Sequence, residues 1–184
     1  MQQESSGKAD KGWGKFHSTR KKAAMPRWPN ETMVRVLFGA DYLVKPLKLG
    51  AETRVLDVGC GFGKNLRPFA DRGYRCAAVE INEEISTVAR SALAEIGVKA
   101  EVKVGSNRAL PFTDASFDLL VAVDTLHYEP SARAASQALA EFARVLRPGG
   151  VVYVSTVGPN HSMSASAEDL GAGRFRVRDY DFRD

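Results

Sequence analysis

Three glycines at alternating positions, Gly59, Gly61 and Gly63, follow a short apolar segment over 54–58. Glycine permits positive φ angles, and it removes the side chains that would hold a ligand away from the backbone. A helix predicted to begin around 63–65 points its first, unpaired N–H groups back toward the end of the strand, where they can hold polar or anionic groups. This arrangement predicts a turn that binds a nucleotide-like ligand.

A carboxylate stands at the end of the next predicted strand. Glu80 comes directly after the apolar run 76–79 and lies 17 residues beyond Gly63. A carboxylate in this position can accept hydrogen bonds from both hydroxyl groups of a ribose, as it does in dinucleotide-binding folds. The alternative is an acidic residue at the N-terminus of the helix predicted over 83–96. We favour the ribose because the acid coincides with the strand end.

The spacing of the glycines argues against a dinucleotide. That fingerprint needs a glycine at the sixth position counted from Gly59, and Lys64 occupies it. A NAD-dependent oxidoreductase is therefore the weaker alternative. An acid, Asp57, just before the glycine run resembles instead the first motif of the class I S-adenosylmethionine-dependent methyltransferases.

The resemblance implies a role for each residue of this region. In that family the loop supports the methionine part of S-adenosylmethionine, and the acid orders the loop and binds the amino group. The implied cofactor-binding residues are Asp57, Gly59, Cys60, Gly61 and Gly63, with Glu80 at the ribose and Ile81 packed on the adenine ring. S-adenosylhomocysteine would be the product derived from the cofactor.

Two later segments extend the resemblance. Gly-Ser-Asn-Arg-Ala-Leu-Pro-Phe over 105–112 is similar to the family segment in which an acid after glycine pairs with the adenine amine. Ser106 stands where that acid is expected, and its hydroxyl or the amide of Asn107 can reach the adenine edge. Arg-Val-Leu-Arg-Pro-Gly-Gly over 144–150 is similar to the turn before the fifth strand of small-molecule methyltransferases. The resemblance covers about residues 30–157.

The residues after the fourth predicted strand, over 117–123, complete the expected cofactor site. The resemblance places Asp124, Thr125 and Leu126 there, with Asp124 lining the carbon chain of the cofactor. A sulfonium already carries an activated methyl group, so the protein needs mainly to align a nucleophile and exclude water. Such positioning can contribute roughly 7 to 11 kcal/mol.

A general base is optional in this chemistry, because the need for one depends on the pKa of the acceptor. His127 is the first candidate for a catalytic base, followed by Tyr128 and His161. The alternative for His127 is that it packs beneath the methionine end of the cofactor or caps the next helix.

These residues all follow predicted strands, which places them on one edge of a sheet. Strands alternating with helices form parallel βαβ units with right-handed crossovers. We expect an α/β fold, with a doubly wound, Rossmann-like, mostly parallel sheet and helices on both faces. Strands are expected over 55–58, 76–79, 99–104, 117–123 and 151–155, and helices over 30–43, 63–73, 83–96 and 130–146.

The length of 184 residues suits one main domain, but charge is unevenly spread. Of the net charge of +4, residues 1–48 carry +6 and the remainder −2. We expect 1–28 to be a basic, partly flexible arm or cap and 29–184 to be the cofactor-binding domain. A basic arm attracts nucleic acid or an anionic substrate, although a solvated leader is the commoner case.

The family adds a helix and an antiparallel hairpin after the fifth strand, which normally takes more residues than follow position 158. Two alternatives fit this shortage. The domain is a compact variant that lacks the hairpin, or the chain is a fragment whose C-terminal part is truncated. We favour the fragment.

Composition narrows the remaining possibilities. Cys60 and Cys76 have no CxxC spacing and the histidines do not cluster, so we expect no metal site. No apolar run reaches the ~18 residues of a membrane span. The first fifteen residues contain no apolar signal segment, so we expect a cytoplasmic protein without a membrane partner.

The expected function is transfer of a methyl group from S-adenosylmethionine to an O, N or C nucleophile of a small-molecule acceptor. The alternative from another class is a non-catalytic module of this fold that binds nucleic acid or protein. The acceptor and the oligomeric state stay open.

Overall fold

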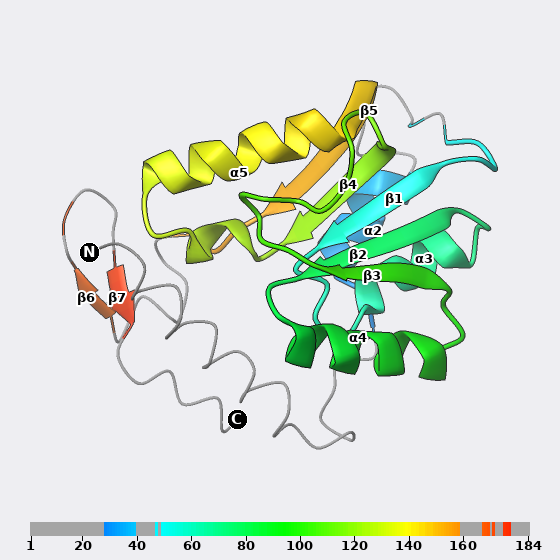
Figure 1. Ribbon diagram of the computed structural model, residues 1–184, viewed down its shortest axis with the longest axis horizontal. Helices are drawn as coiled ribbons and strands as arrows, with labels where there is room; N and C mark the ends of the chain where they lie inside the picture. Colours follow the sequence, from blue (N-terminus) through cyan, green and yellow to red (C-terminus); the bar gives the residue numbers. More distant parts are fainter. Residues whose placement is uncertain are drawn as a thin grey trace.

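The computed structural model describes residues 28–39, 47, 49–158, 167–169, 171 and 175–177. Its centre is a sheet of five parallel strands in the order β3-β2-β1-β4-β5 (Figure 1). The strands are β1 Arg54–Val58, β2 Arg75–Glu80, β3 Ala100–Val104, β4 Phe117–Val123 and β5 Leu146–Ser155. The order reverses direction between β1 and β4, which is the switch point where doubly wound folds bind ligands.

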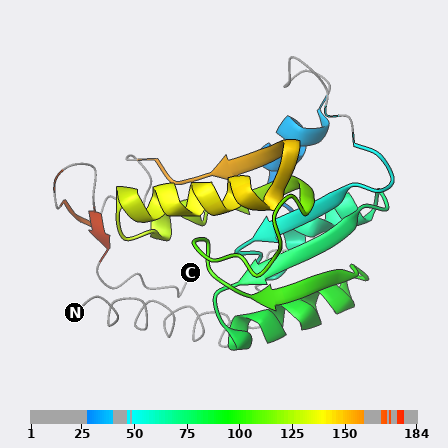
Figure 2. The ribbon, with the colours of Figure 1, turned by 45° about the horizontal axis from the view of Figure 1, so that its top comes forward.

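Helices connect consecutive strands of the sheet, except between β3 and β4. The α-helices are α2 Glu31–Phe38, α3 Arg67–Ala70, α4 Glu83–Glu95 and α5 Ala132–Val145, and the short 3₁₀ turns are η2 Lys64–Leu66 and η3 Leu126–Tyr128. In Figure 2, α4 runs beside β3 at one end of the sheet and α5 beside β5 at the other. Side chains of Asn30, Asn82 and Ser131 each accept a backbone N–H in the first turn of the following helix, and these N-caps fix where α2, α4 and α5 begin.

Alternating residues of the strands form two apolar layers. Val55 of β1 packs on one face with Met33 of α2 and Leu93 of α4, whereas Leu56 packs on the other face with Phe142 of α5. A parallel sheet covered on both faces has strands that are mostly apolar and buried along nearly their whole length, as β1, β2 and β4 are. The predicted α/β fold, doubly wound with helices on both faces, is confirmed.

Two predicted boundaries were wrong. The first helix ends at Phe38 instead of 43, because Gly39 has an extended backbone with ψ 137°. The turn over 147–150 does not precede the fifth strand but lies within β5. Phe117 pairs with Leu146 and Leu119 pairs with Val151, so the extra residues loop out as an irregularity between these pairs.

Beyond the central sheet, β6 Ala167–Asp169 and β7 Phe175–Val177 form an antiparallel pair of their own. Among the helices of the described residues, none combines the length and the apolar character needed to cross a lipid bilayer.

Candidate functional site

The glycine loop adopts the backbone that its sequence predicts. Gly59, Gly61 and Gly63 have φ angles of +69°, +54° and +70°, in the left-handed region that favours glycine. A Cβ atom at Gly59 would lie 2.4 Å from Cγ2 of Thr125, and one at Gly63 would lie 2.4 Å from Cδ2 of Leu93. At these two glycines the atoms that lie close to the backbone are therefore side-chain atoms of Thr125 and Leu93.

Glu80 holds this loop against the end of β2. Its Oε1 accepts the backbone N–H of Gly61 at 2.5 Å, and its Oε2 accepts the N–H of Ile81 at 3.2 Å. The N–H of Gly59 also donates to the carbonyl of Val79 at 2.9 Å. A carboxylate has about four acceptor positions, so each oxygen of Glu80 keeps one for a further donor such as a ribose hydroxyl.

The Glu80 carboxyl is buried, with 7% of the residue exposed. Burial raises its pKa above the ordinary value, and the hydrogen bonds from Gly61 and Ile81 work against that rise. The side chain is thus a desolvated acceptor fixed in direction by two backbone groups.

Asp57 lies in β1, directly before the loop, and is completely buried. Neither of its carboxyl oxygens has a hydrogen-bond partner among the described residues. Burial raises its pKa from 3.8 to about 8, the neighbouring charge of Glu80 adds to the rise, and Lys64 opposes it. Buried polar groups without partners are rare in proteins, and one at a ligand-binding edge is the group that a ligand donor would satisfy.

The loop after β3 reaches the same edge. The N–H of Gly105 donates to the carbonyl of Glu80 at 2.8 Å, and Ser106 and Ala109 exchange two backbone hydrogen bonds that close a tight turn. Ser106 therefore lies beside the end of β2, as the sequence predicts.

Asn107 has a partner that sequence analysis missed. Its Nδ2 donates to Oε1 of Glu129 at 3.0 Å, and Nε of Arg108 pairs with Oε2 of the same carboxylate at 3.0 Å. Glu129 follows the 3₁₀ turn η3, so this carboxylate joins the loop after β3 to the segment after β4. Nothing in the local sequence around Glu129 signals such a partner.

Asp124 directly follows β4 in an unusual conformation for a residue other than glycine, with a φ angle of +54°. Its Oδ1 accepts the hydroxyl of Ser155 at 2.9 Å, and its N–H donates to the Ser155 carbonyl at 3.1 Å. Burial, with the charge of Asp124 as the second cause, raises the pKa of Tyr153. The carboxylate is exposed, so the ends of β4 and β5 present an acidic, hydroxyl-bearing edge beside the loop.

The other predicted residues follow Asp124 directly. Thr125 is buried against Gly59, and its Oγ1 has no hydrogen-bond partner among the described residues. Leu126 packs on the apolar layer beneath α5. The rings of His127 and Tyr128 lie 4.0 Å apart between centroids in the 3₁₀ turn η3, and Tyr128 is exposed.

The structure thus gathers Asp57, the glycine loop, Glu80, Ser106 and Thr125 at the carboxyl edge of the sheet and sets His127 in the turn that follows. His161 lies outside the described residues. Cys60 and Cys76 are buried free thiols. In the part of the chain that the structure describes, no three His, Cys, Asp or Glu side chains are grouped to hold a metal ion.

Comparisons with known proteins show the family of this chain. The family pattern described as "Methyltransferase domain" matches residues 56–154, which begin within β1 and end within β5. Over 111 residues the chain is 33% identical to the ubiquinone biosynthesis O-methyltransferase of Azoarcus sp. (strain BH72), covering 60% of this chain and 46% of that protein. It is 29% identical over 116 residues to a sterol 4-C-methyltransferase of Caenorhabditis elegans, covering 61% and 34%.

A solved structure leads to the same family. A SAM-dependent methyltransferase from Methanosarcina mazei matches with a TM-score of 0.54 and 35% identity, over 58% of this chain and 53% of that one. The chain spans half or less of the length of the two curated relatives. The family match nevertheless runs over more than half of the chain and contains the glycine loop, Glu80 and the strand ends described above. The chain therefore belongs to the class I S-adenosylmethionine-dependent methyltransferase family.

Proposed function

We propose that this chain binds S-adenosylmethionine at the carboxyl edge of β1, β2 and β4 and transfers its methyl group to a small-molecule acceptor. The observation that carries the proposal is the fully buried Asp57 carboxyl, which has no hydrogen-bond partner among the described residues and directly precedes a glycine loop whose Gly61 N–H donates to Glu80. An ammonium group of an amino-acid ligand would supply the donors that Asp57 lacks.

Each residue near this edge has a function in the proposal. Asp57 and the glycine loop hold the amino-acid end, and Glu80 accepts hydrogen bonds from the ribose. Ile81, whose side chain is 44% exposed beside this carboxylate, offers an apolar surface to the adenine. In the proposal Cys60, Thr125 and Leu126 line the site beneath the cofactor, and Ser106 lies at the adenine edge.

The chemical step needs little more than alignment. S-adenosylmethionine, when bound, supplies a methyl group that is already activated by the positive sulfur. The protein has to orient the acceptor in line with it and exclude water, and positioning of this kind is worth roughly 7 to 11 kcal/mol. In the proposal Asp124 lines the carbon chain of the cofactor, and His127 in the following turn takes the proton of an acceptor that needs a base.

The proposal covers an O, N or C atom as the methyl acceptor. One of the two relatives is named for O-methylation and the other for C-methylation.

We also propose that residues 29–184 form one cofactor-binding domain, preceded by a basic arm over 1–28.

Ligand binding to the full chain tests the proposal. S-adenosylhomocysteine should raise the melting temperature and bind with one site in calorimetry, whereas NAD should do neither. Asp57→Asn should weaken the binding of S-adenosylhomocysteine because it removes the negative charge that the ammonium faces. Binding of NAD in preference to S-adenosylhomocysteine would overturn the proposal in favour of an oxidoreductase.

A second measurement addresses the non-catalytic alternative. If the protein binds nucleic acid with a strong salt dependence through its arm, deletion of residues 1–28 abolishes that binding. Such binding together with no affinity for S-adenosylhomocysteine would contradict a methyltransferase.

A further inference from the structure

The loop from 105 to 116 is the connection between strands of the central sheet that contains no helix. It leaves β3 at the edge, passes β2 and β1, and enters β4 (Figure 1). The loop begins with the turn at Ser106 that the proposed function places at the adenine. Glu129 binds Asn107 and Arg108 of this turn, and the second half of the loop has its own partners on α5.

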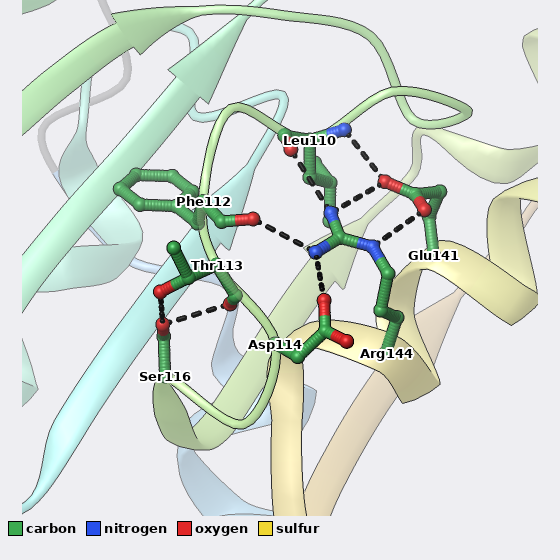
Figure 3. Close-up of polar contacts among 7 residues, drawn as sticks. All are labelled: Leu110, Phe112, Thr113, Asp114, Ser116, Glu141 and Arg144. Carbon is green, nitrogen blue, oxygen red and sulfur yellow. Dashed lines mark hydrogen bonds and ion pairs between the residues drawn. The ribbon is translucent and has the colours of Figure 1, made fainter.

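Arg144 of α5 holds that second half through both terminal nitrogens of its guanidinium group (Figure 3). Nη2 donates to the carbonyl of Leu110 at 3.1 Å, and Nη1 donates to the carbonyl of Phe112 at 2.8 Å and to Oδ1 of Asp114 at 2.7 Å. A planar guanidinium presents its donors in a fixed fork, so it fixes two carbonyls relative to each other as a lysine cannot.

Glu141, one turn earlier in α5, completes the clamp. It accepts Nε of Arg144 at 2.7 Å through Oε1 and Nη2 at 2.8 Å through Oε2, and Oε2 also accepts the N–H of Leu110 at 2.9 Å. Both backbone polar groups of Leu110 are thus bound by α5 side chains. The hydrogen bond from Arg144 is the main reason that the pKa of Glu141 is lowered, so the carboxylate stays charged.

A short path leads from the clamp to Glu80. Leu110 is buried and adjoins Ala109, which is bound to Ser106 by two backbone hydrogen bonds. Gly105 then donates to the Glu80 carbonyl. A Cβ atom at Gly105 would lie 2.6 Å from Cδ of Pro111, so the two ends of this turn are in close contact. A shift of Leu110 or Pro111 would move the turn.

We propose that Arg144 and Glu141 are positioning residues for the cofactor, because their clamp on the backbone of Leu110 and Phe112 sets the turn at 105–109 and thereby the affinity for the adenosine part. This inference rests on the proposed function of the site. Neither side chain lies at the carboxyl edge of the sheet, and both act through Leu110.

The test is calorimetric binding of two ligands to full-length variants, S-adenosylhomocysteine and 5′-methylthioadenosine, which lacks the amino-acid part. Arg144→Met and Glu141→Gln should each raise the dissociation constant of both ligands by about tenfold, since each removes hydrogen bonds to a charged group. An equal factor for the two ligands is expected because the turn contacts only the part that they share.

Two matched variants serve as controls. Arg67→Met removes an arginine that pairs with Asp71 at 2.7 Å and donates to the carbonyl of Ile96 at 3.0 Å, and neither partner belongs to the loop. Asp114→Asn removes the partner that is 78% exposed, where an ion pair contributes little. Both should bind the two ligands within about twofold of the unmodified chain.

The outcomes separate the two proposals. Absence of S-adenosylhomocysteine binding in the unmodified chain overturns the proposed function. If the unmodified chain binds S-adenosylhomocysteine and both Arg144→Met and Glu141→Gln bind it with the same affinity as the unmodified chain, the clamp is overturned. Weakened S-adenosylhomocysteine with unchanged 5′-methylthioadenosine also overturns it. If Arg144→Met does not fold, the test uses Glu141→Gln and amide hydrogen exchange. The clamp requires faster exchange over 105–111 in Glu141→Gln and unchanged exchange there in Arg67→Met.

Discussion

The backbone N–H of Gly61 donates to Oε1 of Glu80 at 2.5 Å, and this bond joins the loop after β1 to the carboxyl end of β2. The carboxylate therefore shapes the loop before any ligand arrives. In the proposed function it also binds the ribose, and these two functions can be separated by substitution.

Substitution of Glu80 should weaken the binding of S-adenosylhomocysteine in two distinguishable steps. Glu80→Gln keeps an oxygen for the Gly61 N–H but loses the charge, whereas Glu80→Ala loses both. We expect Glu80→Ala to cost roughly 1 to 3 kcal/mol of binding free energy, the scale of hydrogen bonds to a charged group, and Glu80→Gln to cost less. Calorimetry measures both, and an unchanged affinity in Glu80→Ala would remove this residue from the site.

Substitution of Gly59 should reveal its contact with Thr125. Gly59→Ala forces a side chain into the left-handed region, at about 1 to 2 kcal/mol, and pushes its methyl group against Cγ2 of Thr125, at about 1 to 3 kcal/mol more. Gly73→Ala is the matched control, because Gly73 has a φ angle of +77° and nothing within 4 Å of the added atom. Urea denaturation should show the larger loss for Gly59→Ala.

The same contact can be relieved from the other side. Thr125→Ser removes Cγ2, so the double variant Gly59→Ala/Thr125→Ser should lose less stability than the two single losses added together. Strict additivity of the two losses would show that the methyl groups do not meet.

The stability of the protein should fall as pH rises, because of Asp57. The folded-state pKa of about 8 exceeds the ordinary value of 3.8, so the folded chain holds a proton that the unfolded chain releases. The contribution of Asp57 to the free energy of unfolding is fully present below about pH 4 and is lost as pH rises toward 8; the loss is about a few kcal/mol at most. Because the pKa of Glu80 is also raised, Glu80 makes the free energy of unfolding fall with pH in the same direction. Asp57→Asn should flatten the dependence in urea denaturation between pH 5 and 8, and an equal slope in both proteins would refute the assignment.

Ligand binding should release protons through the same carboxyl. An ammonium group next to Asp57 favours its ionised form, so the affinity for S-adenosylhomocysteine should rise as pH approaches 8. Calorimetry in two buffers of different ionisation enthalpy measures the proton count. We expect release of up to one proton near pH 7 and none in Asp57→Asn. Equal release in the two proteins would place the linked proton elsewhere.

Removal of the Glu129 carboxylate should loosen the loop after β3. Its side chain is 8% exposed and binds both Asn107 and Arg108, so Glu129→Ala should cost about 1 to 3 kcal/mol of stability and increase hydrogen exchange over 105–109. Glu83→Ala is the control, because Glu83 pairs with Arg90 at the surface and should change neither quantity appreciably. Similar effects of the two substitutions would mean that Glu129 does not hold the loop.

The parts that the sequence predicted well depend on neighbours in the chain. An apolar run followed by Gly59 or by Glu80 marks a strand end, and Asn82 before a helical pattern marks a helix start, so the edge that carries the proposed site follows from local patterns alone. The parallel register of β1 and β2 confirms that these two strand ends lie at the same edge of the sheet.

The contacts that sequence analysis missed join residues that lie far apart along the chain. Glu129 meets Asn107 across 22 positions, and Arg144 meets Leu110 across 34. Such pairs exist only once the strands are ordered 3-2-1-4-5, and no periodicity encodes them. The end of the first helix at Phe38 was missed for another reason, because glycine stops a helix only when its backbone leaves the helical region, as Gly39 does.

The contact between Gly59 and Thr125 restricts how relatives of this chain can diverge. The space between the ends of β1 and β4 admits one methyl group, and here the threonine fills it. A lineage that acquires alanine at the first position should carry serine or glycine at the second, so the two columns of an alignment ought to covary although 66 positions separate them.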